Sequence, residues 1–117
     1  MRDHTSLLAW QEAKKVTSEV LDLSETRWTP PLGAIWGQLQ RSSLSVQLNI
    51  AEGYALGTAP LFTKHIRIAY GSAVETGELL DHLSERLKPP SPTLPTTMAR
   101  CQRSQRLLLG LLRRKSG

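Results

Sequence analysis

Apolar residues recur at helical spacing in four stretches of this chain, and helix-breaking residues separate the stretches. One apolar face on each stretch, at about 100° per residue, predicts four amphipathic helices. Their expected spans are from Thr5 or Ser6 to Ser24, from about Leu32 to Ala55, from Thr58 to about Lys88, and from near Pro95 onward. Prolines at 30, 31, 89, 90 and 92 and the glycine at 57 mark the boundaries. Links this short predict antiparallel neighbours in an up-down-up-down four-helix bundle.

Each predicted helix has one stripe that we expect to form the core. In the first helix it consists of Leu7, Trp10, Val16, Val20 and Leu23. In the second it consists of Ile35, Leu39, Val46 and Ile50, flanked by Leu32, Trp36 and Tyr54. The third contributes Phe62, Ile66, Ala69, Ala73, Leu80 and Leu87, and the fourth Met98, Cys101, Leu108, Leu109 and Leu112.

The second predicted helix also carries another apolar face. That face consists of Leu44, Leu48, Ala51 and Ala55, and a polar group of Arg41, Ser45, Asn49 and Glu52 lies between it and the core stripe. A helix that is apolar on two sides needs two neighbours. The pattern therefore predicts a contact beyond the bundle, between subunits.

Three segments resemble one known protein family. They are LLAWQEA near the start, RSSLSVQLNIAEGY at the centre and IAYGSAVETGELL at Ile68–Leu80. Together they resemble the four-helix-bundle family first noticed as reading frames in intervening sequences of bacterial 23S rRNA genes, often labelled the S23 ribosomal protein family. The resemblance implies a homopentameric barrel of bundles. Many relatives carry proline where this chain has Gln47, so we expect an unbroken second helix here.

Composition agrees with a small helical protein. The 117 residues form one expected domain, residues 1–117, in which only 5% are aromatic. The chain has no apolar run of the ~20 residues that span a bilayer, and its N-terminus lacks a signal-peptide core, so we expect a cytoplasmic protein. The single cysteine, Cys101, is expected to be a buried apolar residue that forms no disulfide or cysteine metal site.

Charge divides the chain into two unequal parts. The first 85 residues carry seven basic and ten acidic side chains, whereas the last 32 carry eight basic and no acidic ones. In the fourth helix the basic residues form a ridge opposite the Leu/Met stripe, and we expect it to bind nucleic-acid phosphates. The ridge consists of Arg100, Arg103, Arg106, Arg113, Arg114 and Lys115.

Two other interpretations of this ridge compete with nucleic-acid binding. It is equally consistent with a solvated face balanced by Glu78, Asp81 and Glu85 of the third helix. Leu107 and Leu111, at its edge, could mark a membrane surface, but the apolar face of this helix is better used inside the bundle. We therefore expect no membrane partner and assign both leucines to a subunit contact.

A polar cluster in the family-like segments is the only candidate for chemistry. It consists of Arg41, Asn49, Glu52, Ser72 and Glu75. The Glu-x-x-His pairs of carboxylate-bridged metal bundles are absent, and Ser72 has no histidine at a spacing that would activate it. We therefore expect no enzyme activity, cofactor or metal, and interpret the cluster as a network that fixes helix register or a subunit contact.

The sequence thus predicts a non-enzymatic, self-assembling basic bundle that serves as a scaffold or accessory factor for RNA or DNA. Relatives in the resembled family include the accessory protein of diversity-generating retroelements, which implies a reverse transcriptase as a protein partner. The alternative is a protein–protein adaptor whose ridge meets an acidic partner and makes no direct contact with nucleic acid.

Overall fold

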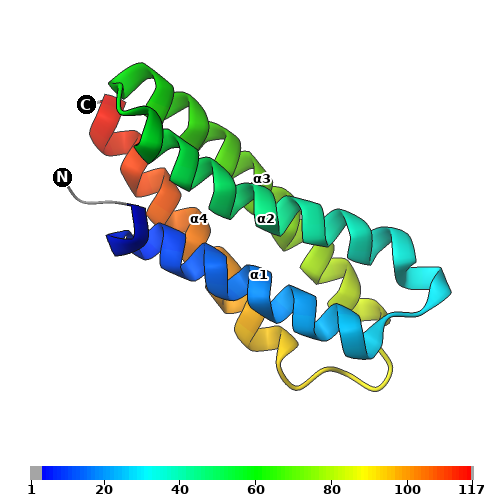
Figure 1. The fold of residues 1–117 in the computed structure, drawn as a ribbon. Coiled ribbons are helices and arrows are strands. Elements are labelled where there is room, and N and C mark those ends of the chain that lie inside the picture. The colour runs from blue at the N-terminus through cyan, green and yellow to red at the C-terminus, as the bar shows by residue number, and fades with distance from the viewer. Residues whose placement is uncertain (1–3, 117) are drawn as a thin grey trace.

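Four α-helices form an antiparallel up-down-up-down bundle, as the sequence predicts (Figure 1). The computed structural model describes residues 4–116, with side chains described as far as residue 114. The helices are α1 (Leu8–Arg27), α2 (Gly33–Leu56), α3 (Ala59–Arg86) and α4 (Leu94–Ser116). Short 3-10 turns occupy His4–Ser6 and Pro30–Leu32. Each helix packs against the next, and α4 packs back against α1.

The α1–α2 and α3–α4 links lie together at one end of the bundle, and both chain ends and the α2–α3 turn lie at the other (Figure 1). We call these the link end and the terminal end.

The helix boundaries follow local backbone preferences. The first helix starts at Leu8, later than predicted, because Leu7 is extended, and it continues past Ser24 to Arg27. Gly57 adopts a left-handed conformation with φ 76°, which suits glycine and ends α2. The third helix ends two residues earlier than predicted, since Lys88 precedes a pair of prolines that disfavour helical backbone before them. The second helix is unbroken through Gln47, as expected.

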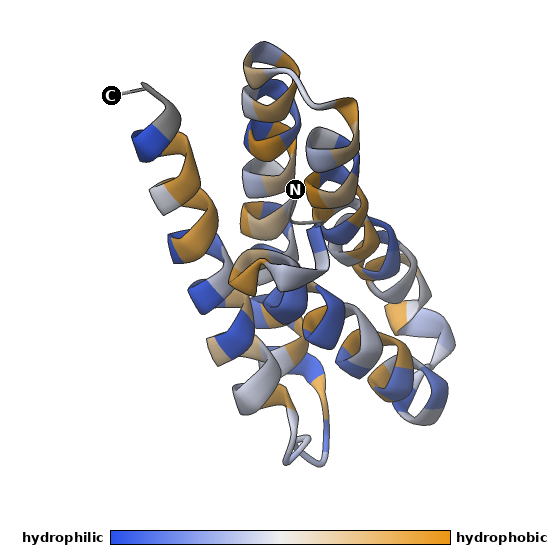
Figure 2. Ribbon diagram, turned by 60° about the vertical axis from the view of Figure 1, so that its left-hand side comes forward, coloured by the Kyte–Doolittle hydropathy of each residue, from blue (hydrophilic) through white to orange (hydrophobic). Residues whose placement is uncertain are grey.

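The core consists of two apolar clusters, one nearer each end of the bundle. The cluster at the link end includes Val20, Trp36, Leu39, Leu80 and Leu83, and the cluster at the terminal end includes Ile50, Ile66, Ala69, Ala73 and Leu108. Figure 2 shows apolar and polar residues alternating along the helices, with a long apolar stretch in the C-terminal half of α4. These buried residues confirm most of the predicted core.

Two assignments in α4 need correction. Leu107 and Leu111 were expected at a subunit contact, but both are half-buried and pack against the terminal-end cluster. This part of α4 is apolar over a broad arc, so one bundle can use leucines on both sides of the predicted stripe. Leu109, predicted for the core, is only half-buried.

Cys101 is buried between α3 and α4, as predicted. Its thiol is 3.3 Å from the carbonyl oxygen of Ala73, and Gln105 Nε2 lies 3.7 Å from the sulfur. Burial disfavours the thiolate and raises the pKa of Cys101 to about 11, although the contact with Gln105 lowers it slightly.

Cys101 should therefore react slowly with thiol reagents while the protein is folded. A thiol with a pKa of about 11 is roughly 100-fold less ionised near pH 8 than a thiol with the ordinary pKa of 9.0. Release of the coloured product of a disulfide reagent should be slow in buffer and rapid in urea. The thiol of the unfolded chain ionises at a lower pH than the thiol of the folded protein. The free energy of unfolding should therefore fall as pH rises from 9 to 11. Equal rates in buffer and urea would contradict the burial.

Candidate nucleic-acid interface

The arginines of α4 fall into two groups with different surroundings. Arg100 and Arg103 turn toward α1 and form ion pairs there. Arg100 Nε is 2.8 Å from Glu19 Oε2 and its Nη1 is 3.6 Å from Glu12 Oε2, while Arg103 Nη1 is 3.6 Å from Glu12 Oε1. Thr97 extends the group by donating its hydroxyl to Glu19 at 2.7 Å. The first part of the ridge is therefore attached to α1.

Glu12 is the least accessible member of this group. Its side chain is only 8% exposed, and Oε2 has no hydrogen-bond partner among the described residues. A buried carboxylate is costly to leave unpaired, so the two guanidinium groups have a structural role beside it. The acids that balance Arg100 and Arg103 lie on α1, and the acidic residues of α3 form no ion pair with them in the described structure.

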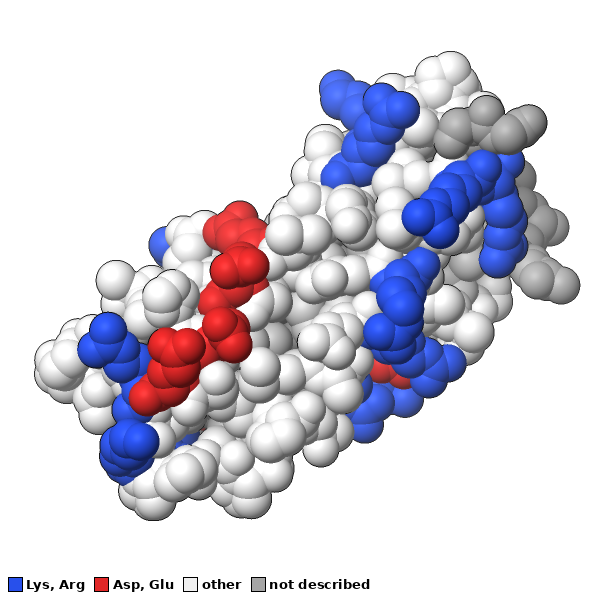
Figure 3. Space-filling view, turned by 180° about the vertical axis from the view of Figure 1, so that it is seen from behind, with Lys and Arg blue, Asp and Glu red and all other residues white. Residues whose placement is uncertain are grey.

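The second group consists of Arg106, Arg113 and Arg114, which are exposed. No described carboxylate forms an ion pair with them. The side chain of Lys115, also assigned to the ridge, lies outside the described residues. Figure 3 shows basic side chains gathered toward both ends of this face of the bundle, beside a row of acidic ones. The exposed acids of α3 that share one helix face are Glu75, Glu78, Asp81 and Glu85.

Part of the predicted polar cluster joins α2 to α3. The hydroxyls of Ser45 and Ser72 lie 2.9 Å apart. Asn49 donates from Nδ2 to the carbonyl and the hydroxyl of Ser45, at 2.9 and 3.1 Å. Its Oδ1 is 2.9 Å from His65 Nδ1, which must be the donor because an amide oxygen only accepts. We call the four residues Ser45, Asn49, His65 and Ser72 the α2–α3 seam.

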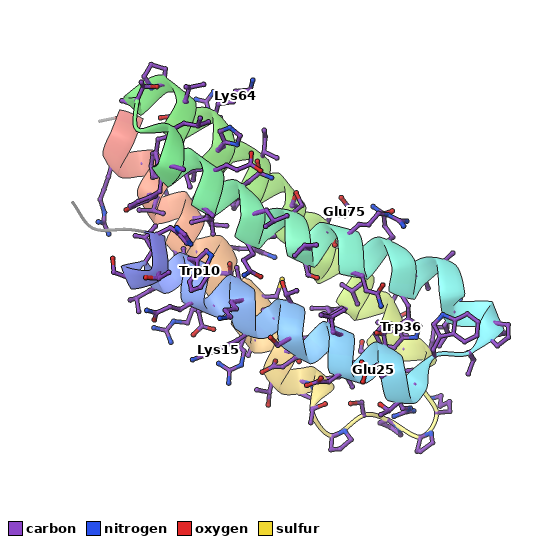
Figure 4. The ribbon with its side chains drawn as sticks, viewed as in Figure 1. Trp10, Lys15, Glu25, Trp36, Lys64 and Glu75 are labelled. Atoms are coloured by element: carbon purple, nitrogen blue, oxygen red, sulfur yellow. The ribbon has the colours of Figure 1, made fainter. Side chains whose placement is uncertain are left out.

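The remaining members of the predicted cluster lie at the edges of this seam. Glu52 is 60% exposed, with Oε2 3.7 Å from His65 Nδ1. Arg41 donates to Gln38 Oε1 at 2.9 Å, and Gln38 in turn contacts the carboxylate of Glu75. Figure 4 shows Glu75 on the outer side of the α2–α3 pair. Because α2 and α3 are antiparallel, Glu52 and Glu75 stand at separate levels rather than in one site.

Small residues let α2 and α3 approach closely. A Cβ atom at Gly53 would lie 3.1 Å from His65 Cβ and 3.5 Å from the Phe62 carbonyl oxygen, so a larger side chain would force the helices apart. Elsewhere Ser42 and Thr76 share a buried hydrogen bond of 2.9 Å. The polar groups thus hydrogen-bond two closely packed helices to each other.

The networks contain residues that are missing from the predicted sites, among them Glu12, Glu19, Gln38 and His65. Helical spacing does carry a signal for one of them, because Glu12 falls on the buried face of α1 beside Ala9, Ala13 and Val16. The others depend on which faces of neighbouring helices meet.

The second apolar face of α2 is exposed in the single bundle. Leu44 and Leu48 are 43% and 47% exposed and Ala55 is also exposed, whereas Ala51, predicted for the same face, is half-buried. This surface, which we call the α2 stripe, is therefore available to another molecule, in agreement with the two-sided pattern of the sequence.

The described residues contain no group of three or more His, Cys, Asp or Glu side chains arranged to hold a metal ion. None of the described helices is long and apolar enough to cross a membrane.

The fold and its networks define an all-α, antiparallel four-helix-bundle protein with a polar seam between α2 and α3 and a basic surface on α4. The chain matches the model of the 23S rRNA-intervening sequence protein family over residues 5–110, and it belongs to that family. Comparisons with curated proteins and with solved structures gave no match.

Asn49 and Glu52 both lie in the family-like segment, but only Asn49 belongs to the seam. We therefore expect their replacement to affect stability differently. Replacement of Asn49 by alanine removes its hydrogen bonds to Ser45 and His65, so the free energy of unfolding should fall by about 1–2 kcal/mol. Replacement of the exposed Glu52 by alanine should lower the free energy of unfolding by less than ~0.5 kcal/mol. Chemical denaturation of both variants measures the difference, and equal losses would contradict the described geometry.

Proposed function

We propose that this chain is a non-enzymatic, self-assembling scaffold or accessory protein that binds RNA or DNA through the exposed arginines of α4. The observation that carries the proposal is the group Arg106, Arg113 and Arg114, which forms no ion pair with any described carboxylate. Guanidinium groups without a neighbouring carboxylate are free to bind phosphate oxygens, and binding to a phosphate backbone releases condensed counterions. Arg100 and Arg103 contribute less, because they already pair with Glu12 and Glu19.

Self-assembly is supported by the α2 stripe. A small protein gains by covering contiguous apolar surface, and the partner that we propose is a second copy of this chain. Family resemblance extends this proposal to a homopentamer, and also to a reverse transcriptase as a protein partner. The cytoplasm is the proposed location.

The proposal of a non-enzymatic role rests on the seam. Its hydroxyl, amide and imidazole groups bond to one another between two helices, where each satisfies a neighbour. Ser72 contacts Ser45 rather than a histidine, so its hydroxyl has no base beside it to take a proton.

Binding should weaken when the free arginines are neutralised. We expect the triple variant Arg106→Gln, Arg113→Gln, Arg114→Gln to bind generic RNA and DNA less tightly at low salt. For duplex DNA, the slope of log affinity against log salt should fall by about 0.9 for each lost phosphate contact. Fluorescence anisotropy across a salt series measures both quantities.

The matched control removes three exposed cations from elsewhere: Lys15→Gln, Lys64→Gln, Arg67→Gln. Both triple variants have the same net charge, so a larger loss in the α4 variant assigns binding to that surface. If wild type fails to bind at low salt, the nucleic-acid proposal is wrong and an adaptor with an acidic protein partner takes its place.

Assembly should depend on the α2 stripe. Wild-type protein should scatter light as a multiple of 13.0 kDa, five-fold for a pentamer. The double variant Leu44→Glu, Leu48→Glu should dissociate it, because a buried charge in an apolar contact is strongly unfavourable. The control variant Leu8→Glu, Leu21→Glu changes two similarly exposed leucines of α1 and should keep the mass. A monomeric wild type would contradict the proposal.

A further inference from the structure

A second basic surface lies at the link end of the bundle, away from the α4 arginines. A hollow of about 240 Å³, open to solvent, lies between the α1–α2 link and the start of the α3–α4 link. The basic residues that line it are Arg27, Arg86 and Lys88, and no acidic residue lines it. Residues from two distant parts of the chain thus place three cations around one hollow.

The hollow also contains the most exposed large apolar side chain of the described chain, the indole of Trp28, which is 54% exposed. An aromatic ring of this size normally gains stability from burial, and Trp36 nearby is fully buried. The exposed face of Trp28 is therefore a feature that the core does not explain.

The indole is also held in place. A Cβ atom at Gly33 would lie 3.1 Å from Trp28 Cζ2 and 3.5 Å from its Nε1, so the ring packs against the first turn of α2 where a side chain is missing. Gly33 has an ordinary helical φ of −55°, and its backbone does not require glycine. The glycine instead makes room for the ring. One side of the indole is supported, and the rest faces solvent.

The three cations around the ring differ in the contacts that they make. Arg27 donates to the carbonyl oxygen of Pro89 and so ties the two links together. Arg86 and Lys88 are exposed, and no described carboxylate forms an ion pair with either. A fixed aromatic platform beside two free cations has the chemistry that recognises a base and its backbone in single-stranded nucleic acids.

We propose that the hollow around Trp28 binds an unpaired nucleobase of single-stranded RNA or DNA, stacked on the indole, with flanking phosphates on Arg86 and Lys88. This inference rests on the proposed nucleic-acid function and names its substrate class. A base in a duplex has both faces covered by its neighbours, so the Trp28 hollow favours single strands, ends or loops over continuous duplex. The α4 arginines supply contacts to phosphate that do not depend on the base.

Three labelled probes of equal length separate these contacts by anisotropy: an oligothymidylate, an abasic oligonucleotide and a blunt duplex. Trp28→Ala should weaken oligothymidylate binding roughly 5- to 150-fold, the range expected for loss of one stacked base. It should leave the abasic probe and the duplex unchanged. Trp28→Phe retains an aromatic face and should keep most of the affinity. Leu21→Ala, which truncates an exposed apolar side chain of α1, should have no effect on any probe.

The cations have their own control. Arg86→Gln with Lys88→Gln should weaken both single-stranded probes more than Lys15→Gln with Lys64→Gln, a pair with the same change in net charge. Tryptophan fluorescence gives an independent readout, since a stacked base quenches the indole. Saturable quenching by oligothymidylate should occur in wild type and disappear in Trp28→Phe.

The results that overturn the inference differ from those that overturn the proposed function. Unchanged oligothymidylate binding in Trp28→Ala, or an equal loss on the abasic probe, would overturn base stacking while leaving phosphate binding intact. A Trp28→Phe variant as weak as Trp28→Ala, with an unchanged melting curve, would overturn it as well. Failure of wild type to bind any of the three probes at low salt would overturn the proposed function itself.

Discussion

The close approach of α2 and α3 is the constraint on which the other surfaces depend. Gly53 leaves no room for a side chain against His65 and Phe62, and the hydroxyls of Ser42 and Ser45 reach partners on α3. Close helices fix one rotation of α2 about its axis. With the small polar side turned to α3 and the Leu39 side turned to the core, Leu44 and Leu48 have no place inside the bundle. The exposed α2 stripe is therefore a consequence of the seam.

A second constraint acts between α1 and α4, where Glu12 is buried beside Arg100 and Arg103. An ion pair of this kind adds little net stability compared with apolar packing, but the loss of one partner leaves a buried charge unpaired. It therefore sets the position of α4 relative to α1. It also divides the ridge, because the arginines nearer the C-terminus are beyond the reach of these acids and remain exposed. The arginines in the first half of α4 thus pair with acids of α1, whereas those nearer its C-terminus are exposed.

The sequence predicted the helices and the core well because both depend on local signals. Proline and glycine mark the links, and apolar spacing selects residues such as Leu39, Ile66 and Leu108, all fully buried. The sites were harder to predict because they depend on which faces meet. Asn49 and Ser72 belonged to the predicted cluster, but their connection runs through Ser45, and Asn49 has a further partner in His65. The Trp28 hollow brings two links together, and no periodicity within one helix contains that contact.

The two basic surfaces are separated by acidic ones, and this has consequences for any bound polyanion. In the half of the bundle nearer the link end, α1 carries Asp22 and Glu25 and α3 carries Glu78, Asp81 and Glu85, all exposed. Arg86 and Lys88 lie at the link end, and Arg106, Arg113 and Arg114 lie in the half of α4 nearer the terminal end. Figure 3 shows a row of acidic side chains between basic side chains toward the two ends of one face. Like charges along the shortest route repel a phosphate backbone. A strand that lay along one bundle would meet this repulsion midway, so the charge pattern favours two separate contacts over one continuous track. Separate contacts suit the proposed scaffold, in which a single-stranded segment would be held at one end of the bundle and a phosphate backbone of any sequence at the other.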